Sequence, residues 1–295
     1  GKIPGSCPRA SEATVPRDFF KTTLNGSFDM SDHTDSDSQN PLENTHNLPF
    51  VAPCRDLDIE APKRWIRLGI ADLRRAPGIS LAYGVTATIL CYIAAYAGFV
   101  ISGPLVLLTI LSGLTLIGPV MAIGLYSISC QLQKGQSPKL SYCFRDGTRG
   151  IGNLGLFTSV LIVLFLVWIH VGHLLHLFFP AGGFISNKTD LVFFFGIGSA
   201  VGAVFAVITF CISAFSLPMI MDRQTDLVTA IVTSINAVLR NRKVMLLWAT
   251  TIVGGMLFSV VTGLLGLVVI FPIIGHATWH AYRETVDASA WPPRT

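Results

Sequence analysis

The sequence predicts an all-α, polytopic membrane protein: six transmembrane helices form three hairpins, with interfacial helices on the cytoplasmic side. Hydrophobic residues make up 51% of the 295-residue chain and charged residues 13%, about half the charged share of an ordinary soluble domain. The stretches 79–128, 154–179, 191–221 and 244–282 contain no Asp, Glu, Lys or Arg. Each stretch exceeds the roughly 20 apolar residues that cross a bilayer's hydrocarbon core.

Turn-forming residues divide these stretches into hairpins. The first hairpin is expected at 79–101 and 105–128, joined by the short turn SGP, and the second at 154–179 and 191–221. The last stretch, 244–282, is too long for one span, so we expect two helices of about 18 to 20 residues folded at TGLLG. The second helix of each hairpin carries a proline: Pro119, Pro218 and Pro272.

The basic residues predict the orientation. Fifteen Lys and Arg residues lie on one predicted side of the membrane. They are found before the first span, between the second and third, between the fourth and fifth, and after the sixth. Lys188 alone lies on the opposite side. The positive-inside rule therefore places both termini in the cytoplasm of a bacterial inner membrane. It also explains the formal charge of +4 without nucleic acid as a partner.

The segments outside the spans differ in composition. Residues 1–60 include the polar stretch MSDHTDSDSQNPLENTHN and predict a disordered tail, because too little apolar surface is available to offset the ordering entropy. Met30 is a plausible natural start, which leaves the status of residues 1–29 open. The six-span domain is expected over 61–287, followed by a short tail over 288–295.

The segment APKRWIRLGIADLRRAPG predicts an amphipathic helix at the headgroups. Its apolar stripe has helical spacing and lies away from the arginines, and Trp65 is placed as an interfacial anchor. The stripe consists of Ile66, Gly69, Ile70 and Leu73.

Two further surfaces are candidates for helix packing or partner contact. Residues 227–243 predict a second interfacial helix, capped near Asp226. A run of small residues in the fourth span allows close helix approach, either within the chain or with a partner protein. The candidate contact residues are Ile231 and Ile235 on the interfacial helix, and Gly198, Gly202 and Ala206 in the span.

The histidines are the candidate metal or haem ligands. His170, His173 and His176 recur every three residues, so they drift across the helix surface, and we interpret them as an interfacial polar stripe. His276 and His280 are four apart and share one face of the last span. Two ligands are too few for a closed metal site.

The remaining motifs argue against catalysis. GIGNLG, at residues 150–155, follows a basic loop rather than a strand, so it does not predict a nucleotide site. The six cysteines form no CxxC pair, and Asp222 and Arg223 are explained as a solvated loop pair. No span carries a carboxylate, lysine or arginine of the kind that ion-coupled transporters hold at mid-membrane. We therefore expect no catalytic residue and no cofactor.

Three blocks resemble a known family: WIRLGIADLRRAPGISLAYG, FSLPMIMDRQTDLVTAIVTSINAVLRNRKVMLLWA and TGLLGLVVIFPIIGHATWHAYRETV. They are similar to a bacterial family of predicted six-span integral membrane proteins of unknown function, and the likeness spans roughly residues 60 to 287. Some members are described as candidate cytochrome c oxidase components, which implies a respiratory-membrane context. The resemblance implies no catalytic residue.

Three functions follow as hypotheses. The first is a non-catalytic accessory subunit or assembly partner of a respiratory, cytochrome c oxidase-type membrane complex, embedded in membrane lipids. The second is an uncoupled transporter or channel for a neutral solute, which the prolines and the weak threefold repeat favour. The third is a haem- or metal-handling membrane protein built on the histidines.

Overall fold

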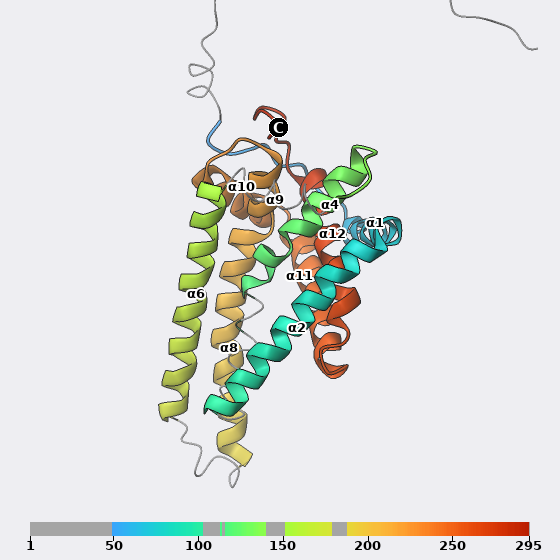
Figure 1. The fold of residues 1–295 in the computed structure, drawn as a ribbon. Helices are drawn as coiled ribbons and strands as arrows, with labels where there is room; N and C mark the ends of the chain where they lie inside the picture. Colours follow the sequence, from blue (N-terminus) through green and yellow to red (C-terminus); the bar gives the residue numbers. More distant parts are fainter. Residues whose placement is uncertain (1–48, 103–112, 114–115, 140–150, 179–187, 295) are drawn as a thin grey trace, which may run out of the picture. The chain divides into compact units, whose positions relative to one another are not determined.

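A computed structural model of the protein describes residues 49–102, 113, 116–139, 151–178 and 188–294. Within these ranges the structure contains helices and no strand, which confirms the all-α polytopic prediction (Figure 1). The described helices are α1 (Ala61–Arg75), α2 (Pro77–Ser102), α4 (Ile123–Gln133), α6 (Ile151–Phe178), α8 (Lys188–Ser213), α9 (Ser216–Asp222), α10 (Leu227–Arg240), α11 (Arg242–Val261) and α12 (Leu267–Thr285).

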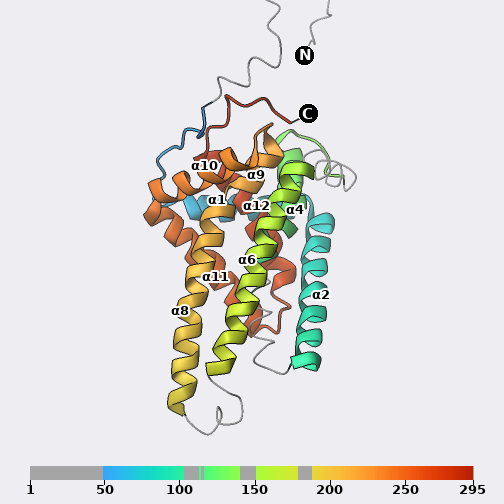
Figure 2. The ribbon, with the colours of Figure 1, turned by 90° about the vertical axis from the view of Figure 1, so that its left-hand side faces the viewer.

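Five stretches are helical, long and apolar enough to cross a membrane: Pro77–Val100, Leu116–Gln133, Gly152–Leu175, Phe195–Asp222 and Arg242–Val261. Helix α12 stands at the position of the sixth predicted span, but it is not among these five stretches, so six spans remain a prediction. Helices α2, α6 and α11 run toward the lower end in Figure 1, and α4, α8 and α12 run back. Both described chain ends lie at the opposite end, beside α9 and α10, which we call the terminal face (Figures 1 and 2).

The third hairpin folds where the sequence predicts. Helices α11 and α12 have 20 and 19 residues, and the turn between them places Gly263 and Leu264 at φ values of 64° and 68°. The Thr262 hydroxyl accepts from the Gly266 amide at 2.9 Å, and the Tyr92 hydroxyl of α2 donates to the Gly263 carbonyl. These bonds satisfy polar backbone groups at the turn and tie it to α2.

The fourth predicted span is broken near its end. Helix α8 ends at Ser213 and α9 starts at Ser216, because Pro218 has no N–H for the Ala214 carbonyl and its ring crowds the preceding turn. A side chain of α10 bonds the backbone at the break: Ser234 Oγ accepts from the Phe215 amide at 3.1 Å and donates to the Cys211 carbonyl at 2.8 Å. The expected continuous helix over 191–221 is therefore two helices held in register by α10.

Helix α12 is the element on which α1, α2 and α4 pack, and glycines permit this contact. A Cβ atom on Gly69 of α1 would lie 2.7 Å from the Ile273 carbonyl oxygen. A Cβ atom on Gly84 of α2 would lie 2.1 Å from the Val268 carbonyl oxygen. Pro272 offers that carbonyl no N–H, so the close approach of α2 falls where α12 lacks a helical hydrogen bond. Backbones this close require residues without side chains.

Both chain segments that flank the helices pack on the terminal face. The Arg55 amide donates to the Thr285 carbonyl at 2.8 Å, and the Asp287 amide donates to the Pro53 carbonyl at 2.8 Å. The compact unit that holds the helices starts at Asn47 and includes the C-terminal residues. The membrane domain predicted from composition, 61–287, does not include the packed segments before and after it. Most of the predicted disordered tail lies outside the described residues.

Candidate functional site

A group of polar side chains, all buried except the exposed Gln133, lies against the C-terminal half of α12. We call it the polar layer and define it as Asp72 of α1, Ser80 of α2, Ser129 and Gln133 of α4, and His276, Trp279 and His280 of α12. Four helices therefore contribute to two neighbouring hydrogen-bonded groups, one around His276 and one around His280. Sequence reasoning singled out the two histidines and missed their partners.

His276 joins three helices. Its Nε2 lies 2.9 Å from Ser80 Oγ of α2, and its Nδ1 lies 2.8 Å from Ser129 Oγ of α4. All three side chains are fully buried, at 0% exposure. One serine donates to the ring and the other accepts from it, since a neutral imidazole has one N–H and one lone pair. Both ring nitrogens are thus occupied by serines.

His280 has a tautomer that its neighbours determine. The Trp279 indole N–H can only donate, and it bonds Gln133 Oε1 at 3.1 Å. The Gln133 amide nitrogen must therefore donate to His280 Nδ1, 3.3 Å away. That leaves the proton on His280 Nε2, which donates to Asp72 Oδ2 at 2.8 Å. The carboxylate of α1 and the amide of α4 orient the ring from opposite sides.

The contact between α1 and α12 corrects the expected role of α1. Trp65 is fully buried rather than anchored at the membrane surface; its ring meets Trp248 edge-on at 5.4 Å between centroids. Its indole N–H donates to Glu284 Oε2 at 2.8 Å. Asp72, at 3% exposure, lies on the same face as Gly69. Of the predicted apolar stripe, Gly69 is buried and Ile66, Ile70 and Leu73 are half-buried; α1 packs on α12 and α11 through the neighbouring side, which carries Trp65 and Asp72.

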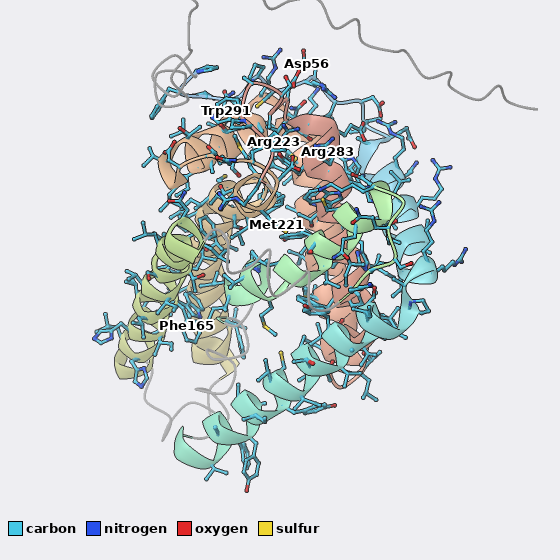
Figure 3. The ribbon with its side chains drawn as sticks, turned by 45° about the horizontal axis from the view of Figure 1, so that its top comes forward. Asp56, Phe165, Met221, Arg223, Arg283 and Trp291 are labelled. Atoms are coloured by element: carbon cyan, nitrogen blue, oxygen red, sulfur yellow. The ribbon has the colours of Figure 1, made fainter. Side chains whose placement is uncertain are left out.

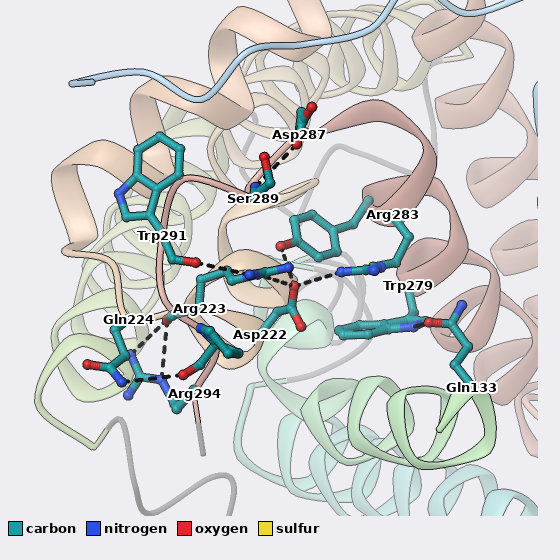
Figure 4. Close-up of polar contacts among 12 residues, drawn as sticks. Gln133, Asp222, Arg223, Gln224, Trp279, Arg283, Asp287, Ser289, Trp291 and Arg294 are labelled. Carbon is teal, nitrogen blue, oxygen red and sulfur yellow. Dashed lines mark hydrogen bonds and ion pairs between the residues drawn. The ribbon is translucent and has the colours of Figure 1, made fainter. Parts of the chain in front are cut away.

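A second polar cluster lies at the terminal face. Asp222 Oδ2 accepts from Tyr282 Oη at 2.9 Å and from Arg223 Nε and Arg283 Nη1 at 3.0 Å each (Figure 4). Arg223 Nη1 also donates to the Trp291 carbonyl at 2.9 Å, and Figure 3 shows these side chains at the same end. The prediction of a solvated Asp222–Arg223 pair is wrong, because their side chains are 11% and 17% exposed. The cluster fastens the C-terminal segment.

The first histidine group lies on the opposite side of its helix from the packing contacts. His170 and His173 are exposed, while Trp168 on the other face of α6 meets Phe205 of α8 at 5.5 Å between ring centroids. His173 Nδ1 lies 3.1 Å from the Ile169 carbonyl oxygen of its own helix. His176 belongs to α6, but its side chain is outside the described part. The described pair points toward the surroundings of the bundle rather than into it.

The small-residue run of α8 faces α6 within the chain. A Cβ atom on Gly202 would lie 3.1 Å from the Trp168 ring, and one on Gly198 would lie 3.9 Å from Leu175. Ala206 is exposed. Contact within the hairpin therefore accounts for the two glycines.

Helix α10 turns its small polar side chains inward. Asp226 caps it as predicted, accepting from the Thr229 amide at 2.9 Å. The helix ends at Arg240 rather than at residue 243. Its buried residues are Thr229, Ala230, Thr233, Ser234, Ala237 and Val238. Ile231 and Ile235 are half-buried at the edge of this face, and Val228 and Leu239 are 55% and 50% exposed.

The polar layer contains a serine and a histidine at the spacing of a catalytic pair, but the serine is not accessible to a substrate. A serine hydroxyl 2.9 Å from an imidazole is the spacing of a nucleophile and its base. The serine is fully buried, however, and the nitrogen that would need an orienting carboxylate bonds Ser129 instead. Among the described residues, no group of three His, Cys, Asp or Glu side chains is arranged to hold a metal ion. The arrangement suits helix–helix adhesion in lipid, where polar side chains bond across helices.

One sequence signal pointed to the missed residues. Trp65, Gly69, Asp72 and Ala76 follow each other at steps of four, three and four, so Asp72 belongs to the buried face of α1. A carboxylate on a buried face calls for a polar partner. The identity of that partner depends on a contact between residues 208 positions apart, which spacing alone does not reveal.

Together, the helices and their hydrogen bonds define a multi-pass, all-α integral membrane protein. A family model described as "Predicted integral membrane protein (DUF2189)" matches residues 105–222. The match confirms the resemblance to an integral membrane family of unknown function over α4, α6, α8 and α9; it does not show the oxidase context, and α1 and α12 lie outside it. No curated protein and no solved structure matches the chain.

Proposed function

We propose that this chain is a non-catalytic accessory subunit or assembly partner of a larger inner-membrane complex of the cytochrome c oxidase type. The observation that carries the non-catalytic part is the polar layer. Its imidazole nitrogens, at His276 and His280, are occupied by side chains of α1, α2 and α4. They are therefore used for holding helices together. The choice of an oxidase as the partner rests on the family resemblance.

The outward faces of the long helices support a role within the membrane. Ile89, Ile93 and Tyr96 of α2 are 51%, 59% and 73% exposed, and Val163 and Leu166 of α6 are 57% and 55% exposed. Such faces are suited to lipid acyl chains or to the helices of another membrane protein. An accessory subunit needs surfaces of this kind on more than one side.

The alternative of an uncoupled transporter receives less support. Transporters use broken helices whose free backbone groups meet the solute. The break between α8 and α9 is closed instead, because Ser234 bonds both the Phe215 amide and the Cys211 carbonyl. The haem- or metal-handling alternative is also less favoured, since the buried histidines use both ring nitrogens within the chain.

Co-purification at native expression tests the proposal. The tagged chain, extracted from native membranes in mild detergent, is expected to retain oxidase subunits identifiable by mass spectrometry, and cells lacking it should assemble less oxidase. Solute flux into proteoliposomes and absorbance near the Soret band examine the two alternatives. If the chain emerges alone and oxidase assembly is unchanged in its absence, the accessory role is excluded.

The orientation is part of the proposal: both termini in the cytoplasm of the inner membrane, as the basic residues of the terminal face predict. Single cysteines at Ser137 and Leu265, in a background without native cysteines, test it. Both positions are exposed; Ser137 follows the end of α4, and Leu265 lies in the turn between α11 and α12, which is at the opposite end of the helices in Figure 1. An impermeant thiol reagent added outside should label Leu265→Cys. Labelling of Ser137→Cys in its place reverses the assignment.

A further inference from the structure

We propose that the outward face of α1 binds the headgroups of anionic phospholipids. The face consists of Arg67, Arg74 and Arg75, which are all exposed, and we call it the arginine face. Successive residues turn by 100°, so Arg67 and Arg74 lie within 20° of each other and Arg75 lies 80° from Arg67. The packed residues Trp65, Gly69 and Asp72 lie on the opposite side of the helix.

These arginines differ from the other cations of α1 in having no anionic partner. Lys63 pairs with Glu60 at 2.9 Å, and Arg64 pairs with Asp58 at 2.9 Å and with Glu284. Across the described part of the chain, no ion pair includes Arg67, Arg74 or Arg75. The one carboxylate within α1, Asp72, is buried and bonded to His280. Three guanidinium groups with five donors each thus face outward unneutralised.

The depth of α1 selects a lipid as the occupant. Figures 1 and 2 show α1 running across the long helices, and it crosses α12 where Gly69 approaches the Ile273 carbonyl and the Ala277 amide. Helix α12 continues for eight residues beyond Ala277, to Thr285, which is roughly 12 Å at 1.5 Å per residue. The start of α1 lies near the end of α12, where Arg64 and Trp65 bond Glu284, and its last turn, with Arg74 and Arg75, leads directly into the span that begins at Pro77.

The chemistry of the face agrees with that position. Leu68, next to Arg67, is 44% exposed, so an apolar side chain borders the cations. Long basic side chains beside a span extend to the headgroup layer, where phosphates accept their hydrogen bonds. Anionic lipids attract such cations with about a five-fold gain in affinity for each Lys or Arg. A nucleic acid or acidic peptide would approach from the solvent beyond the terminal face.

Lipid titration of the purified full-length chain tests the proposal. Native mass spectrometry in detergent micelles measures the binding of phosphatidylglycerol and of phosphatidylcholine with the same acyl chains. The wild-type chain is expected to prefer phosphatidylglycerol. The variant Arg67→Gln/Arg74→Gln/Arg75→Gln should lose about 100-fold in affinity for phosphatidylglycerol, from three five-fold factors, and bind phosphatidylcholine as before.

A matched control separates position from total charge. The variant Arg55→Gln/Lys63→Gln/Arg240→Gln removes the same charge from cations that already pair with Asp287, Glu60 and Asp56. It should retain phosphatidylglycerol binding within about three-fold, because those cations are neutralised locally. Arg67→Lys/Arg74→Lys/Arg75→Lys should keep the preference and shows that the positions tolerate substitution.

Three outcomes overturn the proposal. The first is an equal loss of phosphatidylglycerol affinity in the two glutamine variants, and the second is equal affinity of the wild-type chain for the two lipids. The third is displacement of phosphatidylglycerol by millimolar inorganic phosphate, which would identify a phosphate site rather than a lipid site. The experiment uses the isolated chain, so its result does not depend on the partner complex.

Discussion

The two histidine groups have the same residue type and opposite surroundings. His276 is fully buried and His280 is 9% exposed, and each ring is held by side chains from two other helices. His170 and His173 lie on the outward face of α6 and are exposed. The difference comes from the neighbours rather than from the histidines. Helix α12 is covered by α1, α2 and α4, whereas α6 contacts α8, α9 and α10 and leaves its histidine side exposed.

The glycines repeat this contrast. On α1, α2 and α12, a Cβ atom at Gly69, Gly84 or Gly275 would lie within 2.7 Å of a neighbouring atom. At Gly155 of α6 and Gly196 of α8 it would meet nothing within 4 Å. Glycine allows close contact in the first region, whereas in the second Gly202 faces the Trp168 ring at 3.1 Å and Gly155 and Gly196 leave space. The chain thus combines a tightly packed region around α12 with an α6–α8 hairpin that is open to lipid.

The largest expected effect tests the packing contrast. Gly84→Ala places a methyl group 2.1 Å from the Val268 carbonyl, and backbone atoms cannot move aside as a side chain tip does. We expect a loss of about 3 kcal/mol or more in unfolding free energy, at the upper end of overpacking costs. Gly196→Ala is the control and should leave stability unchanged or raise it by up to about 1 kcal/mol, because alanine is the better helix former. Thermal unfolding in detergent measures both, and similar shifts would contradict the assigned close approach.

The second prediction concerns the polar layer. His276→Leu leaves the Ser80 and Ser129 hydroxyls buried without their partner, which should cost about 2 to 3 kcal/mol. In a Ser80→Ala/Ser129→Ala background the same change should cost less, since no hydroxyl remains to be orphaned. A double-mutant cycle from thermal unfolding gives the coupling. Additive effects would show that His276 does not bond the serines.

The third prediction concerns the broken helix. Ser234→Ala removes the bonds to the Phe215 amide and the Cys211 carbonyl, so we expect a loss of about 1 to 2 kcal/mol. Thr250→Ala removes a hydroxyl that bonds the carbonyl of its own helix at an exposed position, and should be nearly neutral. Hydrogen exchange across 210–218 should rise in the first variant alone. Unchanged exchange there would mean that Ser234 does not hold the break.

The smallest effect is expected at the outer histidines. His170→Leu/His173→Leu should change the unfolding free energy by less than about 0.5 kcal/mol, because both side chains are exposed and neither bonds another helix. Together with His276→Leu, this variant measures how far the two histidine groups differ. A loss above 2 kcal/mol, or a bound metal in the wild type that disappears in the variant, would indicate a role for the outer pair.

The sequence predicted the features that depend on residues close together in the chain. The charge-free runs predicted the five helices that are long and apolar enough to span, TGLLG predicted the turn between α11 and α12, and Asp226 predicted the start of α10. Contacts between distant segments were not predicted. Pro218 was recognised, but the break it causes depends on Ser234 of α10.

The candidate site shows the same limit. The pair His276 and His280 was found by its spacing, yet Asp72, Ser80 and Ser129 come from other helices. Trp65 was expected at the membrane surface because amphipathic spacing does not distinguish a helix that lies on lipid from one that lies on another helix. In this chain the side of α1 that carries Trp65 lies on other helices rather than on lipid.

The position of α12 in the chain has a consequence for biosynthesis. It follows every other described helix, so α1, α2 and α4 leave the ribosome well before the helix on which they pack. Until then Asp72, Ser80 and Ser129 lack the imidazoles that satisfy them in the folded protein. A chain interrupted after α11 would therefore leave one carboxylate and two hydroxyls without their partners on α12.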